Sequence, residues 1–149
     1  MKYIEALRKF GKNYNPFIHI KKEEIVEEEQ NFIVIAARAP YAKNHLLIIP
    51  KRQVYLLKEL NEIEKNEMWK LIERWTTKLQ KKHKDVNLLL RDGLVEGNIG
   101  KSINHLHFHL IPDCAIGLEG KSNPDDRKFF SDQEYIENTE KIKKEFLAK

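Results

Sequence analysis

Residues 105–109 read His-Leu-His-Phe-His, and this run constrains the fold more than any other feature of the chain. Successive side chains of a β-strand point to opposite faces, so His105, His107 and His109 would line one face while apolar residues line the other. The alternation covers residues 103–111 and predicts a strand there. One face of that strand must meet a core, and the other must hold three imidazoles together.

Three crowded imidazoles have two chemical uses. They can divide the roles of nucleophile, proton donor and orienting group, because an ordinary imidazole titrates near neutral pH. They can also bind a metal, since a His-x-His pair on a strand suits zinc or copper. The row itself leaves both uses open.

The segment before the histidines favours phosphorus chemistry. Gly100 lets backbone amides approach a ligand, Ser102 can donate a hydroxyl, and Lys101 carries a charge suited to phosphate. We interpret these residues as an anion cradle that leads directly into the histidine row. A metal site would more often include carboxylate or cysteine partners and no adjacent lysine.

Two separated motifs resemble the histidine triad (HIT) superfamily of nucleotide hydrolases and transferases. The pattern His-φ-His-φ-His-φ-φ, with φ apolar, is complete at residues 105–111, and residues 44–52 (Asn-His-Leu-Leu-Ile-Ile-Pro-Lys-Arg) are similar to the upstream strand of that family. Arg91 ends the stretch at which the family has a phosphate-contacting segment. The resemblance covers about residues 15–115.

The resemblance implies a two-step displacement that needs no metal or cofactor. His107 would attack the α-phosphorus of a nucleotide and form a covalent nucleotidyl-histidine. His109 would protonate the leaving group, His105 would support the site, and His45 would orient the triad from a neighbouring strand. The phosphate oxygens would be held by Arg91, Gly100, Lys101 and Ser102.

Some positions depart from the family pattern. Lys101 and Arg91 stand where many members have neutral amides, which indicates either a site for a more highly charged phosphate group or, for the lysine, a solvated loop residue. Ala37 occupies the position of a common ribose-binding Asp or Asn, which weakens any claim of nucleoside specificity. The zinc-binding Cys-x-x-Cys of some members is missing from residues 13–17, so we expect no structural zinc.

Composition is consistent with one cytoplasmic domain. At 149 residues the chain can bury a single core, and we expect one domain over residues 1–149 with residues 117–149 as a C-terminal extension. The formal charge of +4 comes from separate acidic and basic runs, so general nucleic-acid binding is not expected. The single Cys114 favours a reducing compartment, and no apolar stretch is long enough to cross a membrane.

Periodicity predicts an α+β fold. We expect an antiparallel sheet of about five strands (24–27, 32–36, 45–50, 86–91 and 103–111), a short helix at 3–10, and two longer helices. Capping boxes at Asn61 with Glu64 and at Ser131 with Glu134 predict where the longer helices begin, and we expect them to reach about Lys82 and Phe146.

Three functional hypotheses remain. The first is a nucleotide hydrolase or nucleotidyl transferase acting on dinucleoside polyphosphates or nucleoside phosphoramidates. The second is a nucleotide-binding regulatory module with negligible turnover, which the absence of a ribose ligand at Ala37 favours. The third is a metal-dependent enzyme. The resemblance further implies a homodimer that pairs through the long helix.

Overall fold

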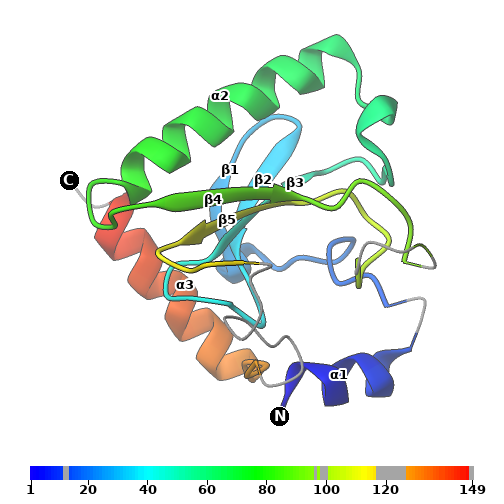
Figure 1. Cartoon of the computed structure of the whole chain (residues 1–149), viewed down its shortest axis with the longest axis vertical. Coiled ribbons are helices and arrows are strands. Elements are labelled where there is room, and N and C mark those ends of the chain that lie inside the picture. The colour runs from blue at the N-terminus through cyan, green and yellow to red at the C-terminus, as the bar shows by residue number, and fades with distance from the viewer. Residues whose placement is uncertain (12–13, 96, 98–100, 117–126, 148–149) are drawn as a thin grey trace.

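A twisted antiparallel sheet forms the centre of the molecule (Figure 1). The computed structural model describes residues 1–11, 14–95, 97, 101–116 and 127–147. Within these ranges the strand order is β1-β2-β3-β5-β4, and each neighbouring pair is antiparallel. The predicted α+β class, with a sheet of five strands, is confirmed. The strands are β1 (Ile25–Glu28), β2 (Phe32–Ala36), β3 (Leu46–Pro50), β4 (Val86–Leu90) and β5 (Phe108–Pro112).

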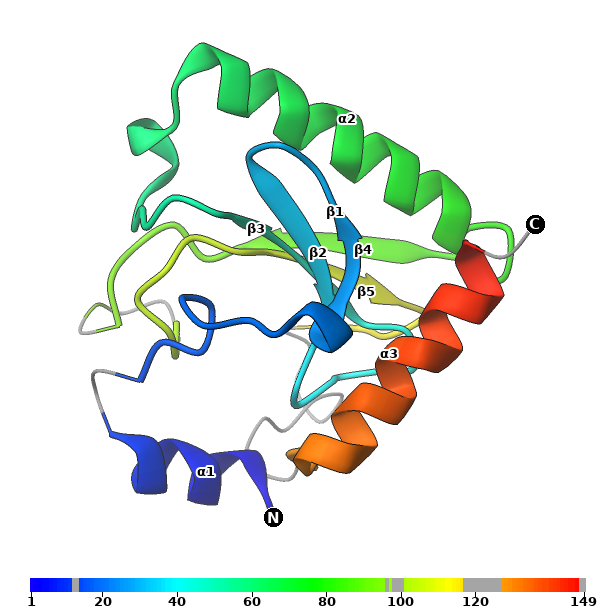
Figure 2. The ribbon, with the colours of Figure 1, turned by 180° about the vertical axis from the view of Figure 1, so that it is seen from behind.

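Helices lie on both sides of this sheet (Figures 1 and 2). The α-helices are α1 (Tyr3–Phe10), α2 (Glu62–Leu79) and α3 (Asp132–Phe146), and single 3₁₀ turns occur at η1 (Lys22–Glu24) and η2 (Leu57–Glu59). α1 matches the predicted range. α2 ends at Leu79, earlier than the expected Lys82, because the chain turns at residues 80–82.

The central strands β2 and β3 are buried on both faces. Val34 of β2 lies opposite Ile48 of β3, and both join the core beneath α2 and α3. Ile35 lies opposite Leu47, and both join a smaller cluster on the other face. This two-sided burial explains why these strands are almost continuously apolar. The face of Leu47 is the one that carries the candidate site.

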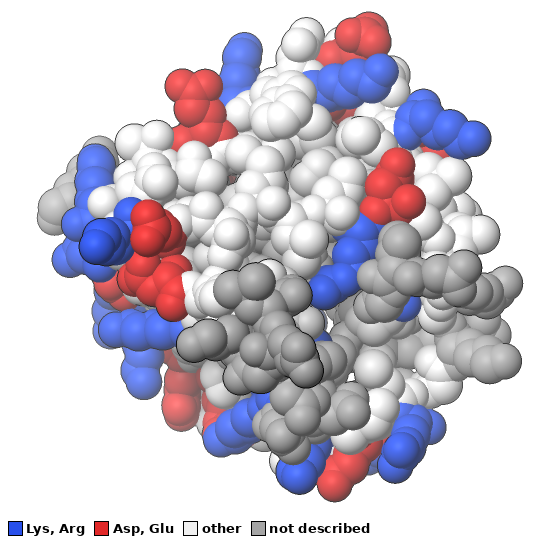
Figure 3. All heavy atoms as spheres, in the orientation of Figure 1, with Lys and Arg blue, Asp and Glu red and all other residues white. Residues whose placement is uncertain are grey.

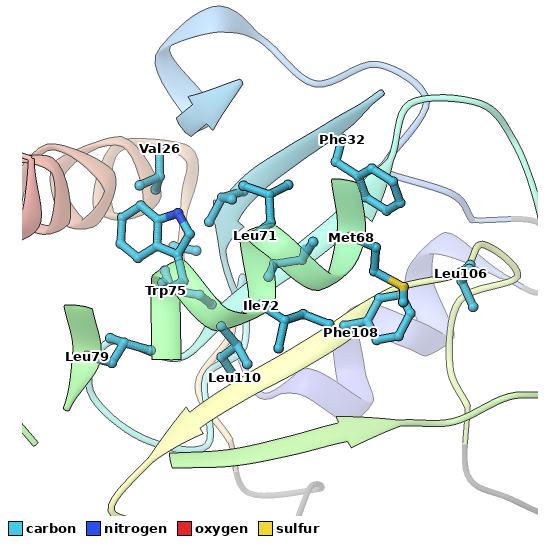
Figure 4. Close-up of a cluster of buried hydrophobic side chains, with 14 of the residues drawn as sticks. Val26, Phe32, Met68, Leu71, Ile72, Trp75, Leu79, Leu106, Phe108 and Leu110 are labelled. Atoms are coloured by element: carbon cyan, nitrogen blue, oxygen red, sulfur yellow. The ribbon is translucent and has the colours of Figure 1, made fainter. Parts of the chain in front are cut away.

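The main core is formed by the apolar stripe of α2 (Figure 4). Met68, Leu71 and Trp75 point from the helix toward the sheet, where they meet Phe32 of β2 and Phe108 of β5. The predicted capping box is present: Asn61 accepts a hydrogen bond from the backbone of Glu64, whose carboxylate in turn accepts one from the backbone of Asn61. The tryptophan and methionine of this stripe are therefore core residues.

α3 completes the same side of the sheet. Its capping box at Ser131 and Glu134 is present as predicted, and Tyr135, Thr139 and Ile142 are buried. The Tyr135 hydroxyl donates to the carbonyl of Ala36 at the end of β2, at 2.7 Å. The C-terminal helix is thus packed into the main core.

The opposite face is covered by the beginning of the chain. Figure 2 shows the segment after α1 crossing this face of the sheet. Residues 1–3 pair with residues 127–129 through backbone hydrogen bonds, from Tyr3 N to Arg127 O at 2.7 Å and from Phe129 N to Met1 O at 2.8 Å. The beginning of the chain is therefore joined to the start of the segment that leads into α3.

The prediction of a strand over residues 103–111 was wrong at its beginning, since β5 starts at Phe108. The backbone of His105 bonds to the nearby carbonyl of Ile103, and that of Leu106 bonds to Val54, beyond the end of β3. These bonds replace the ladder that a longer strand would make. The alternation of faces nevertheless continues, because Leu106, Phe108 and Leu110 all enter the main core.

Candidate active site

His109 and His45 form a buried pair beside the sheet. His109 lies on β5 opposite Leu47, and His45 immediately precedes β3. His45 Nε2 and His109 Nδ1 are 3.0 Å apart. The backbone N–H of Tyr41 donates to His45 Nδ1 at 3.1 Å, so that nitrogen must be the acceptor. His45 therefore carries its proton on Nε2 and donates a hydrogen bond to His109 Nδ1. Because Nδ1 of His109 is the acceptor, a neutral His109 carries its own proton on Nε2.

The tautomer of His107 is fixed by a backbone carbonyl. His107 Nδ1 lies 2.7 Å from the carbonyl oxygen of His105, which can only accept, so Nδ1 carries the proton. The lone pair of His107 is consequently on Nε2. Its ring centre is 4.9 Å from that of His109. The free lone pair on His107 Nε2 and the N–H of His109 Nε2 therefore belong to neighbouring rings.

His105 has a different environment from the other two. Its Nε2 donates to the carbonyl of Pro50 at 3.0 Å, and its Nδ1 lies 3.4 Å from the side-chain amide of Asn15. Both ring nitrogens are therefore engaged, and the side chain is fully buried. The ring packs edge-on against Phe17, which also contacts His107. This position suits support of the neighbouring histidine through the backbone.

Burial holds all four histidines in the neutral form. Desolvation, with a smaller contribution from Arg127, lowers the pKa of His45 to about 3. Desolvation likewise lowers the pKa of His107 to about 4, although its hydrogen bond to His105 opposes the shift. The pKa of His109 is lowered well below its usual range, and that of His105 is lowered too, in each case mainly by burial. At neutral pH the site therefore holds an unprotonated His107.

A cavity of about 350 Å³ opens onto three of these imidazoles, those of His45, His107 and His109. Its wall on the side away from the sheet comes from α1 and the segment after it, through Tyr3 and Phe17. Most of the remaining lining is apolar or aromatic, which is typical of a small-molecule site. His105 does not line the cavity.

Three of the four predicted phosphate-binding residues line the same cavity: Arg91, Lys101 and Ser102. Gly100 lies outside the described residues. Arg91 places Nη1 at 3.5 Å from His109 Nε2 and Nη2 at 3.5 Å from the Tyr41 hydroxyl. Ser102 is hydrogen-bonded to the Tyr3 hydroxyl, so α1 and the predicted cradle are in direct contact.

The structure excludes one of the two interpretations of Lys101, the solvated loop lysine. Its side chain is buried, with only 4% of the residue exposed, so it is not a solvated loop lysine. The ammonium donates to the carbonyls of Tyr55 at 2.9 Å and Gly93 at 2.8 Å. Burial lowers its pKa from the ordinary value. Two of its three N–H bonds thus tie backbone segments together beside the cavity.

Sequence reasoning missed Arg127 and Tyr41, which also line the cavity. Arg127 follows the triad by 18 residues or more and belongs to no recognisable motif. Ala37 lines the cavity as well, and its methyl group offers no hydrogen bond to a ribose.

No three His, Cys, Asp or Glu side chains are arranged to hold a metal ion within the described ranges. The hydrogen bonds explain this for the histidines, because His45 and His109 direct nitrogens at each other and His105 directs both away from the cavity. None of the described helices has the length and apolar character needed to span a membrane.

Comparison with known proteins places this chain in one family. Residues 19–115 match the HIT domain family, and the chain belongs to it. It is 33% identical over 102 residues to an uncharacterized HIT-like protein of Chlamydia muridarum, covering 62% of this chain and 72% of the relative. It is 25% identical over 108 residues to the bis(5′-adenosyl)-triphosphatase of Dictyostelium discoideum, covering 71% of this chain and 70% of the relative.

The fold has a full-length structural counterpart. The Plasmodium falciparum diadenosine triphosphate hydrolase, solved in complex with cyclomarin A, aligns with a TM-score of 0.63, 20% sequence identity, and coverage of 100% of this chain and 99% of that chain. At this identity the likeness shows the shared fold. The HIT family binds nucleotide substrates and includes nucleotide hydrolases.

Proposed function

We propose that this protein is a nucleotide hydrolase or nucleotidyl transferase that cleaves at an α-phosphorus through a covalent intermediate on His107. The observation that carries the proposal is the pairing of complementary nitrogens in one cavity. His107 Nε2 has a free lone pair at neutral pH, and His109 Nε2 has a free proton. A phosphorus held between them would meet a nucleophile on one side and a donor at its leaving group.

The first step forms one bond and breaks another. The lone pair of His107 Nε2 attacks the α-phosphorus, and the bond from phosphorus to the bridging atom breaks with its electron pair leaving on that atom. His109 donates a hydrogen bond from Nε2 to the bridging atom as negative charge develops there. His45 keeps His109 in the required tautomer by donating to Nδ1.

The second step regenerates the protein. A water molecule attacks the phosphorus of the nucleotidyl-histidine, the phosphorus–nitrogen bond breaks, and its electron pair returns to His107 Nε2. The surplus proton of the water passes to solvent, and a nucleoside monophosphate is released. If another nucleophile replaces water, the same intermediate gives a nucleotidyl transfer.

The experiment uses diadenosine triphosphate and adenosine 5′-phosphoramidate, with release of AMP as the readout and acid-quenched protein examined by mass spectrometry. We expect AMP from at least one substrate and a nucleotidyl adduct on the peptide that contains His107. His107→Asn should lower turnover by several orders of magnitude. His19→Asn, at an exposed histidine away from the cavity, is the matched control.

Three outcomes would contradict the proposal. Nucleotide binding without turnover would favour the regulatory module. Loss of activity in a chelator, restored by one divalent ion, would favour the metal-dependent enzyme. A His107→Asn protein with normal melting temperature and near-native activity would remove His107 from the mechanism.

We further propose that the protein forms a homodimer through α2 and β4. β4 is an edge strand, so one side of its backbone is unpaired within the described sheet. Large apolar side chains are exposed on both elements, with Leu88 of β4 at 44%, and Trp69 and Ile63 of α2 at 58% and 71%. Figure 3 shows an uncharged region in the middle of this side of the molecule. Light scattering of the native protein should give twice the mass of the monomer, and Trp69→Glu should lower the measured mass to that of the monomer. A native protein with the monomer mass would contradict the proposal.

A further inference from the structure

Arg127 projects into the cavity between two tyrosine rings. Its guanidinium carbon lies 4.4 Å from the ring centre of Tyr3 and 3.8 Å from that of Tyr41. One terminal nitrogen donates to the carbonyl of Ala39. Contact with both rings and the bond to Ala39 restrict the guanidinium, so the orientation of its remaining N–H groups is limited before any ligand arrives.

No carboxylate among the described residues neutralises this charge, and Arg127 Nε is buried without a hydrogen-bond partner. Arg38 provides the contrast. It also stacks on two rings, at 4.8 Å from Phe129 and 5.0 Å from Tyr135, but it is paired with Asp132 at 2.6 Å. Arg127 is half-buried, and a cation partly removed from water without a carboxylate partner is unfavourable, a cost that an anionic ligand would relieve.

A second guanidinium converges on the same place. Arg91 Nη2 reaches the Tyr41 hydroxyl, so Tyr41 lies between the two arginines. Arg91 Nη1 also lies 3.5 Å from His109 Nε2, a nitrogen that carries a proton in the neutral imidazole. Two donors therefore face each other without an acceptor, and an anionic oxygen placed between them could accept from both.

The neutral state of His109 limits which leaving groups suit this site. A phosphate leaves readily as an anion that needs only hydrogen bonds and positive charge. An amine must receive a whole proton, which a buried imidazole with a strongly lowered pKa holds only rarely. The two arginines supply what a departing phosphate requires and nothing that an amine requires.

We propose that Arg127 and Arg91 form a second anion-binding subsite on the leaving-group side of His109, which holds the phosphates beyond the α-phosphate of a polyphosphate substrate. The inference rests on the proposed function for the placement of the α-phosphate. It assigns dinucleoside polyphosphates as the substrate class and gives Arg127 the role of a specificity-determining residue.

The test compares two substrates that share an adenylyl group, diadenosine triphosphate and adenosine 5′-phosphoramidate. Arg127→Met removes the charge and keeps an apolar side chain between the tyrosines, whereas Arg127→Lys keeps the charge and loses the planar fork. Lys70→Met is the control, because it removes one exposed charge from α2, across the sheet from the cavity. Calorimetric titration with inorganic tripolyphosphate gives a second readout that needs no turnover.

We expect Arg127→Met to lower kcat/KM for diadenosine triphosphate by about ten- to a hundredfold, mainly through KM, and to weaken tripolyphosphate binding similarly. Arg127→Lys should fall between the native protein and Arg127→Met. Turnover of the phosphoramidate should change by less than about threefold, as should both activities in Lys70→Met.

The outcomes separate this inference from the proposed function. Equal losses on both substrates, or none on either, would overturn the subsite while leaving the chemistry at His107 intact. If the native protein turns over neither substrate but loses tripolyphosphate binding on Arg127→Met, the subsite stands and the proposed function fails. If Arg127→Met melts at a much lower temperature than the native protein, Arg127→Lys provides the test instead. An unchanged ratio of kcat/KM for the two substrates in Arg127→Lys would overturn the role of the planar guanidinium.

Discussion

The buried histidines make the folded protein sensitive to mild acid. In an unfolded chain an imidazole has a pKa near 6.5, but burial lowers the pKa of His45 to about 3 and that of His107 to about 4. At a pH between the unfolded pKa and the folded pKa, each histidine is protonated in the unfolded chain and neutral in the folded protein. The free energy of unfolding is therefore unaffected well above pH 6.5 and falls as pH drops toward the folded pKa values.

The size of this effect follows from the two pKa values. Each proton taken up only by the unfolded chain lowers the free energy of unfolding by about 1.4 kcal/mol per pH unit. From pH 7 to pH 5 this amounts to about 2 kcal/mol for each of the two histidines, or about 4 kcal/mol together. The burial of His109 acts in the same direction. A loss of this size is a large part of the stability of a small domain.

The change in the free energy of unfolding with pH can be measured by urea unfolding followed by tryptophan fluorescence, because Trp75 is fully buried in the core. We expect the native protein to lose about 4 kcal/mol or more between pH 7 and pH 5, and His45→Gln or His107→Gln to lose about 2 kcal/mol less than the native protein over the same interval. His19→Gln, at an exposed position, should behave like the native protein. A native protein equally stable at both pH values would refute the reasoning, as would histidine variants with an unchanged pH dependence.

Three further predictions concern the site. With diadenosine triphosphate as substrate, kcat/KM should be flat from pH 8 to about pH 5.5 and fall only as His107 is protonated near its pKa of about 4. An acid limb centred near pH 6.5 would contradict the lowered pKa of His107. Prolonged dialysis against a chelator should leave activity unchanged, and elemental analysis showing stoichiometric zinc would count against the phosphorus chemistry. Lys101→Met should lower the free energy of unfolding by about 2 kcal/mol, because it leaves the carbonyls of Tyr55 and Gly93 without their hydrogen-bond donor. Thermal unfolding measures this loss, and an unaltered midpoint would show that water replaces the ammonium.

Local signals in the sequence were sufficient for much of the fold. Both capping boxes lie where the longer helices begin, since a cap depends on residues only three positions apart. The strand over residues 103–111 was predicted too long because its early part bonds to Val54, a partner that no local pattern reveals. Alternation predicted which side chains share a face, and that depends only on extended backbone.

The candidate site shows the same division between local and distant information. The triad could be found because its spacing is itself the signal, and His45 because residues 44–52 resemble the upstream strand of the HIT family. The burial of Lys101 could not be predicted because its partners are the carbonyls of Tyr55 and Gly93, which only folding brings to it. Arg127 gave no signal at all, since a single arginine in a charged stretch becomes notable only once two tyrosines enclose it.

The pairing of residues 1–3 with residues 127–129 places parts of both flanking segments at the same cavity as the imidazoles. The imidazoles lie inside the segment 19–115 that matches the HIT family, whereas Tyr3, Phe17 and Arg127 lie outside it. Changes in the two flanking segments can therefore reshape the cavity while His45, His107 and His109 keep their hydrogen bonds. A chain trimmed to residues 19–115 would retain the triad and lose one wall of its binding site, so studies of substrate preference require both flanks.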